Sequence, residues 1–197
     1  MNAEDVENPF CTRRVRPGAM PFLFAGDLTA ENAVARLREN GWRGQIVGPH
    51  GSGKSALLAT LVPAIERAGR RVLLLELHDG QRTLPLDFWR GAELASCTLL
   101  AIDGYEQLGR WTRFRLARFC PAGLLVTAHA SVGLPELCRT AVDLDLACRL
   151  ATQLQCRHRV LVTAHDVAQR FPRHGGNLRE LLFDLYDLYE QRQRKHS

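Results

Sequence analysis

The segment that most constrains this chain is GPHGSGKS at residues 48–55. It matches the phosphate-binding pattern G-x-x-x-x-G-K-[ST] at every fixed position. The residues before it, 44–48, form a short run typical of a buried strand, and Ala56, Leu57 and Leu61 after it recur at helical spacing. A strand, a glycine-rich loop and a helix in this order are the context that the pattern requires, so the segment predicts an α/β fold.

The residue types in this segment suit a polyphosphate. Glycine allows positive φ, so successive main-chain N–H groups can turn toward the phosphates at the positive end of the helix. Lys54 is predicted to bind the β- and γ-phosphates, and the Ser55 hydroxyl to hold Mg²⁺. The alternative is a flexible glycine turn. Lys54 and Lys195 are the only lysines among 26 basic residues, so a lysine at this position counts against that alternative, because its compact charge suits a phosphate. The residues predicted to bind the nucleotide here are Gly48, Pro49, His50, Gly51, Ser52, Gly53, Lys54, Ser55 and Ala56.

Composition excludes several classes of protein. The 197 residues are 46% hydrophobic, which suits one packed domain or a core with a small appendage. There is no run of about 18 uncharged apolar residues and no basic start followed by an apolar stretch, so we expect a cytoplasmic protein without a membrane span. The six cysteines form no C-x-x-C pair and the seven histidines no zinc-binding spacing, which favours reduced thiols and no structural zinc.

The order of apolar runs predicts three parts. Residues 1–26 are irregular and carry three prolines, residues 27–145 form the core, and residues 146–197 form a small helical lid. Thr29 is expected to cap a helix to Asn40, and Pro63 to kink or interrupt the helix after the glycine loop. Continuous apolar runs predict a five-stranded parallel sheet between helices. The runs are 44–48, 72–77, 98–102, 124–126 and 141–144.

A carboxylate follows the third apolar run. Asp103 directly follows residues 98–102, and a strand beside the phosphate loop places an Asp near Mg²⁺ in this way. The alternative is that Asp103-Gly104 is an ordinary turn. ATPases of this kind place a Glu next, to activate the attacking water. Here that residue is Gly104, so efficient hydrolysis is in question, and Glu106 is the nearest candidate base, or else a solvated carboxylate at a helix start.

With these motifs the chain resembles the AAA+ family of ATPases over about residues 40–190, especially compact members related to replication initiators and transposition or secretion ATPases. Residues 176–181, GNLREL, are similar to the family's sensor-2 segment, which implies that Arg179 approaches the γ-phosphate. The resemblance also implies a sensor-1 role for Thr127 and an arginine-finger role for Arg139. The alternatives are that Arg179 is an exposed helix arginine, Thr127 a strand-end hydroxyl and Arg139 a surface charge.

Three functions stay open on these observations. The first is a P-loop, AAA+-like switch that binds ATP and Mg²⁺ and hydrolyses ATP slowly. The second is a small-molecule or nucleotide kinase that uses Asp79, Arg82, Arg157 and Arg159. The third is a nucleotide-binding adaptor or loader that contacts DNA or a protein with little turnover.

Partners other than ATP are less constrained. A protein partner and self-association stay open, and the net charge of +5 permits a nucleic acid. The four arginines of 110–118, however, spread over more than half of the helix circumference, which favours a solvated surface.

Overall fold

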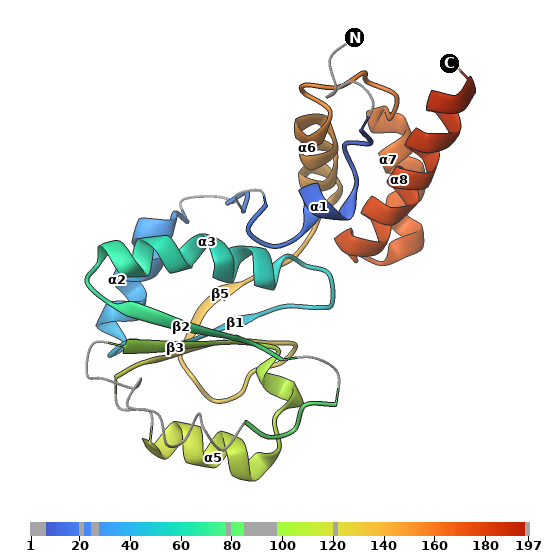
Figure 1. The fold of residues 1–197 in the computed structure, drawn as a ribbon. Helices are drawn as coiled ribbons and strands as arrows, with labels where there is room; N and C mark the ends of the chain where they lie inside the picture. The colour runs from blue at the N-terminus through green and yellow to red at the C-terminus, as the bar shows by residue number, and fades with distance from the viewer. Residues whose placement is uncertain are drawn as a thin grey trace. The chain divides into compact units, whose positions relative to one another are not determined.

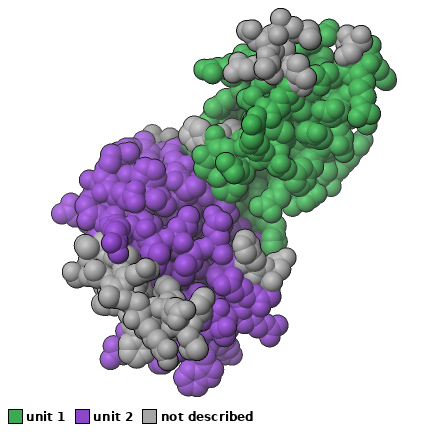
Figure 2. Space-filling model, in the orientation of Figure 1, with its two compact units in different colours: residues 1–23, 49–53, 141–197 green, residues 24–48, 54–140 purple. Residues whose placement is uncertain are grey.

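The computed structural model divides the chain into two compact units (Figure 2). The first, here called the sheet unit, contains residues 24–48 and 54–140. The second, the helical unit, contains residues 1–23, 49–53 and 141–197. The division passes through the glycine-rich loop, and the three-part domain division stays a prediction. The structure describes residues 7–19, 22–24, 28–77, 80–84, 98–119 and 122–195.

A five-stranded parallel sheet forms the centre of the sheet unit (Figure 1). Its order is β2-β3-β4-β1-β5, with every pair parallel. This confirms the predicted α/β fold class. The strands are β1 (Arg43–Val47), β2 (Arg71–Glu76), β3 (Thr98–Asp103), β4 (Leu124–Ala128) and β5 (Glu136–Arg139).

The position predicted for the fifth strand, 141–144, is wrong. β5 ends at Arg139, and Asp143 instead caps the next helix, because its carboxylate accepts the Leu146 main-chain N–H at 2.7 Å. β5 lies at the edge of the sheet and buries only Leu137 fully. A half-exposed edge strand lacks the continuous apolar run that marks the central strands.

Helices cover both faces of this sheet. In Figure 1, α2 (Ala30–Glu39) and α3 (Lys54–Arg67) lie on one face, and α5 (Arg110–Phe119) lies on the other. The predicted cap of α2 is confirmed, since the Thr29 hydroxyl accepts the Asn32 N–H at 3.1 Å. A short 3₁₀ turn, η2 (Tyr105–Gln107), joins β3 to α5.

The helix after the glycine loop is not interrupted at Pro63. α3 continues to Arg67, because proline removes only one main-chain donor while the buried stripe continues through Ile65. Gly69 stops the helix just beyond Arg67. Gly69 adopts φ +86°, and the Arg70 N–H donates to the Ile65 carbonyl at 3.3 Å, which closes the last turn.

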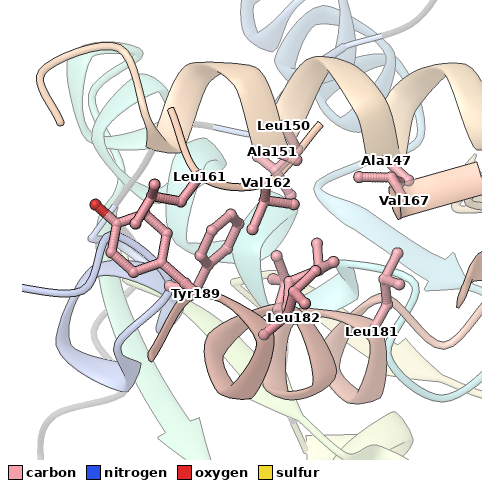
Figure 3. Close-up of a cluster of buried hydrophobic side chains, with 12 residues drawn as sticks. Ala147, Leu150, Ala151, Leu161, Val162, Val167, Leu181, Leu182 and Tyr189 are labelled. Atoms are coloured by element: carbon pink, nitrogen blue, oxygen red, sulfur yellow. The ribbon is translucent and has the colours of Figure 1, made fainter. Parts of the chain in front are cut away.

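The helical unit packs around a core of its own (Figure 3). Its helices are α1 (Thr12–Val15), α6 (Leu144–Leu154), α7 (Ala164–Arg170), η3 (Phe171–His174) and α8 (Leu178–Lys195). Leu150, Val162 and Leu185 belong to this core. The N-terminal segment joins it, since Phe10 is fully buried and packs edge-on against Tyr189 at 6.1 Å between ring centroids. Among the described residues, no helix is long and apolar enough to cross a membrane.

A buried carboxylate ties α7 to α8. Asp166 forms two hydrogen bonds with the Arg192 guanidinium, at 2.6 and 2.7 Å. It also accepts the Thr163 N–H, and the Thr163 hydroxyl accepts the Asp166 N–H in return, which caps α7. The Arg192 hydrogen bonds, followed by those from Thr163, hold the pKa of Asp166 well below its ordinary 3.8, against the opposing effect of burial.

We therefore predict that Asp166→Asn lowers the free energy of unfolding at neutral pH by about 2 kcal/mol, since it removes a charged partner from Arg192. Because the folded pKa is lowered, the carboxylate contributes this stability above about pH 4 and loses it progressively at lower pH. Urea denaturation measures both effects. Asp145→Asn is the matched control, because Asp145 is 79% exposed and pairs with Arg149 at the surface. Equal losses in the two variants would contradict the prediction.

Candidate nucleotide-binding site

The glycine-rich loop joins β1 to α3 and turns back on itself. Gly51 and Gly53 adopt φ +67° and +89°, which L side chains rarely adopt. The Ser52 hydroxyl donates to the Pro49 carbonyl at 2.8 Å, which closes the turn. α3 begins at Lys54, so Lys54, Ser55 and Ala56 form its first turn, where main-chain N–H groups lack helical acceptors. Pro49 and His50 are exposed.

The start of α8 contacts this loop within the helical unit. The Leu178 N–H donates to the Gly51 carbonyl at 3.2 Å. A Cβ at position 51 would lie 1.8 Å from Asn177 Oδ1, so the contact requires glycine there. Asn177 in turn accepts the Glu180 N–H at 3.3 Å. The segment predicted as sensor 2 is thus in contact with the loop, while Arg179 itself is exposed and has no ion pair among the described residues. Its role stays a prediction.

Lys54 is the central cation of the loop and is only 8% exposed. Its ammonium donates to the Gly48 carbonyl at 2.8 Å and lies 3.3 Å from His129 Nδ1. His129 Nε2 lies 2.7 Å from Glu106 Oε1. An ammonium group can only donate, so Nδ1 accepts and Nε2 carries the proton shared with Glu106; this tautomer is assigned from the partners. Lys54, His129 and Glu106 therefore form one chain of polar contacts.

The predicted candidate base, Glu106, is held in place by its turn. Its main-chain carbonyl accepts from the Arg113 guanidinium, which also donates to the Leu108 carbonyl at 2.7 Å and lies 5.6 Å over the Tyr105 ring. Its second carboxylate oxygen, Oε2, is buried without a hydrogen-bond partner in the described part of the chain. Sequence reasoning identified Glu106 but missed His129, which follows β4 directly.

Asp103 and Thr127 meet at the ends of β3 and β4. The register that pairs Ile102 with Val126 places the next residue of each strand side by side. The Thr127 hydroxyl donates to Asp103 Oδ1 at 2.5 Å and accepts the Gly104 N–H at 2.9 Å. Thr127 is fully buried. This hydroxyl therefore orients the carboxylate that the sequence predicts as a metal ligand.

The turn after Asp103 disfavours an acid at position 104. Gly104 adopts φ +78°, and a Cβ there would lie 2.9 Å from Gln107 Nε2. The Gln107 amide is itself engaged, donating to the Leu77 carbonyl at 3.1 Å. A glutamate at 104 would be strained both in its backbone and against Gln107.

Within the described part of the chain, the structure shows no hydrogen bond between the remaining predicted residues and these groups. Arg139, in β5, pairs with Glu136 of the same strand at 2.6 Å, and its arginine-finger role stays a prediction. Arg82, Arg157 and Arg159, which the kinase hypothesis used, are exposed, and Asp79 lies outside the described residues. The described residues include no cluster of three or more His, Cys, Asp or Glu side chains able to hold a metal ion by themselves.

No protein-family model and no curated protein sequence matches this chain. Solved structures do match it. The replication initiator DnaA bound to AMPPCP and single-stranded DNA aligns with a TM-score of 0.59 and 15% identity, covering 88% of this chain and 66% of that one. A DNA replication initiation factor gives 0.61 and 14%, covering 92% and 68%. AMPPCP-bound DnaA from Aquifex aeolicus gives 0.55 and 16%, covering 88% and 68%.

These likenesses concern the fold. The chain has an AAA+ P-loop NTPase-like fold, which confirms the resemblance inferred from the motifs. It spans about two thirds of the length of these solved chains.

We predict that Thr127→Val lowers the free energy of unfolding by about 1–3 kcal/mol, because it leaves the Gly104 N–H and Asp103 Oδ1 without this buried partner. Thr127→Ser keeps the hydroxyl, so it should lose much less of the free energy of unfolding than Thr127→Val does. Denaturant titration of both proteins measures it. Equal stability of the valine and serine variants would contradict the role given to the hydroxyl.

Proposed function

We propose that this protein binds ATP with Mg²⁺ at residues 48–55 and acts as a nucleotide-dependent switch. The observation that carries the proposal is the buried Lys54 ammonium, held on the Gly48 carbonyl at the start of α3, next to a loop with two positive-φ glycines. Two solved proteins with this fold hold the ATP analogue AMPPCP. The sequence has no guanine-reading N-K-x-D segment, so ATP is preferred over GTP.

The residues present fit a Mg²⁺-bound triphosphate. Main-chain N–H groups of the loop and of the first turn of α3 would bind phosphate oxygens, together with Lys54. Ser55 and Asp103 would hold the metal, and Thr127 keeps the Asp103 carboxylate in one orientation. Bound Mg²⁺ supplies positive charge against the phosphate oxygens.

The contact between the loop and α8 supports a switch. The Gly51 carbonyl accepts the Leu178 N–H, so a movement of Gly51 on binding phosphate would change this bond. Leu178 precedes Arg179, which is exposed and available for an anion. Nucleotide binding would thereby alter the first turn of α8, and this altered turn would be the output of the switch.

Lys54→Ala should weaken ATP binding about 10- to 150-fold, which corresponds to the roughly 1.5–3 kcal/mol of a hydrogen bond to a charged group. Calorimetric titration with ATP and Mg²⁺ measures the dissociation constant. Lys195→Ala is the matched control, because Lys195 is the other lysine and is exposed near the end of α8. Parental affinity in Lys54→Ala would refute the nucleotide site.

For hydrolysis, we propose that His129 is the base and Glu106 positions it. When Lys54 turns from His129 toward a phosphate, the Nδ1 lone pair becomes able to accept a proton from water. Nε2 keeps its proton and donates it in a hydrogen bond to Glu106. The Glu106 carboxylate stabilises the imidazolium that forms. This pair would take the place of the acid that the Gly104 turn excludes, and the indirect arrangement agrees with slow turnover.

His129→Ala should lower the turnover number about 100-fold or more while ATP affinity changes only a few-fold, because the base acts on water and not on bound nucleotide. Glu106→Gln should show the same split with a smaller loss. Single-turnover phosphate release beside equilibrium binding separates the two quantities. Undiminished turnover in His129→Ala would overturn this mechanism and leave the binding site intact.

The Gly104 turn also favours a second function, a nucleotide-binding adaptor with little turnover, since the usual catalytic acid cannot be placed there at low cost. Tight ATP binding with no phosphate release from the parent protein, over a range of protein concentrations, would identify the adaptor. Transfer of phosphate to an added metabolite would instead identify a kinase.

A further inference from the structure

The outward face of α5 carries two large aromatic side chains in contact with each other. Trp111 is 80% exposed and Phe114 is 62% exposed. Their ring centroids are 6.2 Å apart and the rings are nearly perpendicular, at 88°. The other exposed large hydrophobic residues in the described part of the chain, Leu74, Leu144, Val160 and Phe183, lie on other elements or between them. The aromatic pair on α5 is therefore a distinct apolar patch.

Packing of the sheet unit does not require these side chains. α5 is anchored through its opposite face, where Thr112 and Leu116 are buried and Leu116 joins a core with Leu100, Leu108 and Val126. Exposing a large aromatic side chain forgoes the favourable free energy of its burial. Two such side chains in contact form an exposed apolar patch, the kind of feature that interaction surfaces carry.

Arginines surround the two rings. At about 100° per residue, Arg110, Phe114, Arg118, Trp111 and Arg115 fall, in that order, within a sector of about 140°. Arg113 falls outside it and contacts the Glu106 turn instead. The four arginines of α5 do spread around the helix, yet three of them share one side with both aromatics. The ten residues of α5 include no acidic side chain.

We propose that this surface, which we call the aromatic face of α5 (Arg110, Trp111, Phe114, Arg115 and Arg118), docks an acidic segment of another protein that carries apolar side chains among its carboxylates. Trp and Arg are the residue types that dominate binding energy in protein interfaces, with aromatic anchors at the centre and charges at the rim. The arginines supply the complementary charge and attract the acidic segment over a distance.

Two other occupants fit this face less well. A second copy of the chain in a two-fold contact would bring the arginines of both copies together, which is repulsive. A single-stranded nucleic acid would stack its bases on exposed ring faces. Perpendicular rings in contact cannot both offer parallel faces to successive bases, whereas together they form one ridge that apolar side chains can surround.

The test uses the full chain and a fluorescein-labelled synthetic peptide in which Glu and Asp alternate with Leu and Phe anchors. Fluorescence anisotropy measures the binding of this peptide to the protein. We expect Trp111→Ser with Phe114→Ser to weaken binding at least about tenfold. Phe183→Ser, at an exposed phenylalanine of α8, should leave it unchanged. Both variants should unfold at the parental denaturant concentration, since the changed side chains are exposed. Arg115→Glu, made in the parent protein, should also weaken peptide binding. Peptide binding should weaken as the salt concentration rises.

Several results would overturn the proposal. They are no binding of the acidic peptide, equal binding of a peptide whose anchors are replaced by Ser, or equal losses in the α5 and α8 variants. Tighter binding of an oligothymidylate that is lost in the α5 variant would assign the face to single-stranded nucleic acid. Self-association that disappears in that variant, seen by sedimentation, would assign it to a second copy.

Discussion

The polar groups at the strand ends depend on one constraint, the burial of the Lys54 ammonium. A buried charge is costly unless it is hydrogen-bonded. Here the Gly48 carbonyl at 2.8 Å and His129 Nδ1 at 3.3 Å are the polar partners of the ammonium. Both partners follow from sheet order, because β1 pairs with β4 and Val47 lies opposite Ala128. The residues after these two strands, Gly48 and His129, are thereby brought together on either side of the ammonium.

The same sheet edge orders the remaining groups of the sheet unit. β3 lies on the other side of β4, so Asp103 meets Thr127, and the turn at Gly104 then carries Glu106 back to His129. Arg113 fixes that turn from α5. Three strand ends and one helix thus hold two carboxylates, a hydroxyl, an imidazole and an ammonium in fixed positions. Rigid elements support such an arrangement better than a mobile loop would.

Much of this could be predicted because it rests on local signals. The turn of the glycine-rich loop and the cap at Thr29 depend on hydrogen bonds within a few residues. His129 was missed because its significance depends on strand order; its only signal was its place just beyond a strand next to β1. The position of β5 and the expected interruption at Pro63 were wrong for a related reason, since edge strands and buried helix faces are defined by neighbours far along the chain.

The sequence by itself therefore determined the glycine-rich loop between a strand and a helix, the α/β class, the Thr29 cap and the presence of Asp103 and Glu106 near a strand end. Only the tertiary structure decided that Glu106 reaches Lys54 through His129, that an acid at position 104 would be strained, and that Asn177 and Leu178 contact Gly51. It also decided that Trp111 and Phe114 face outward and not into the core. The physical reason is that caps and loops are set by short-range hydrogen bonds, whereas these contacts require strand register and packing between distant segments.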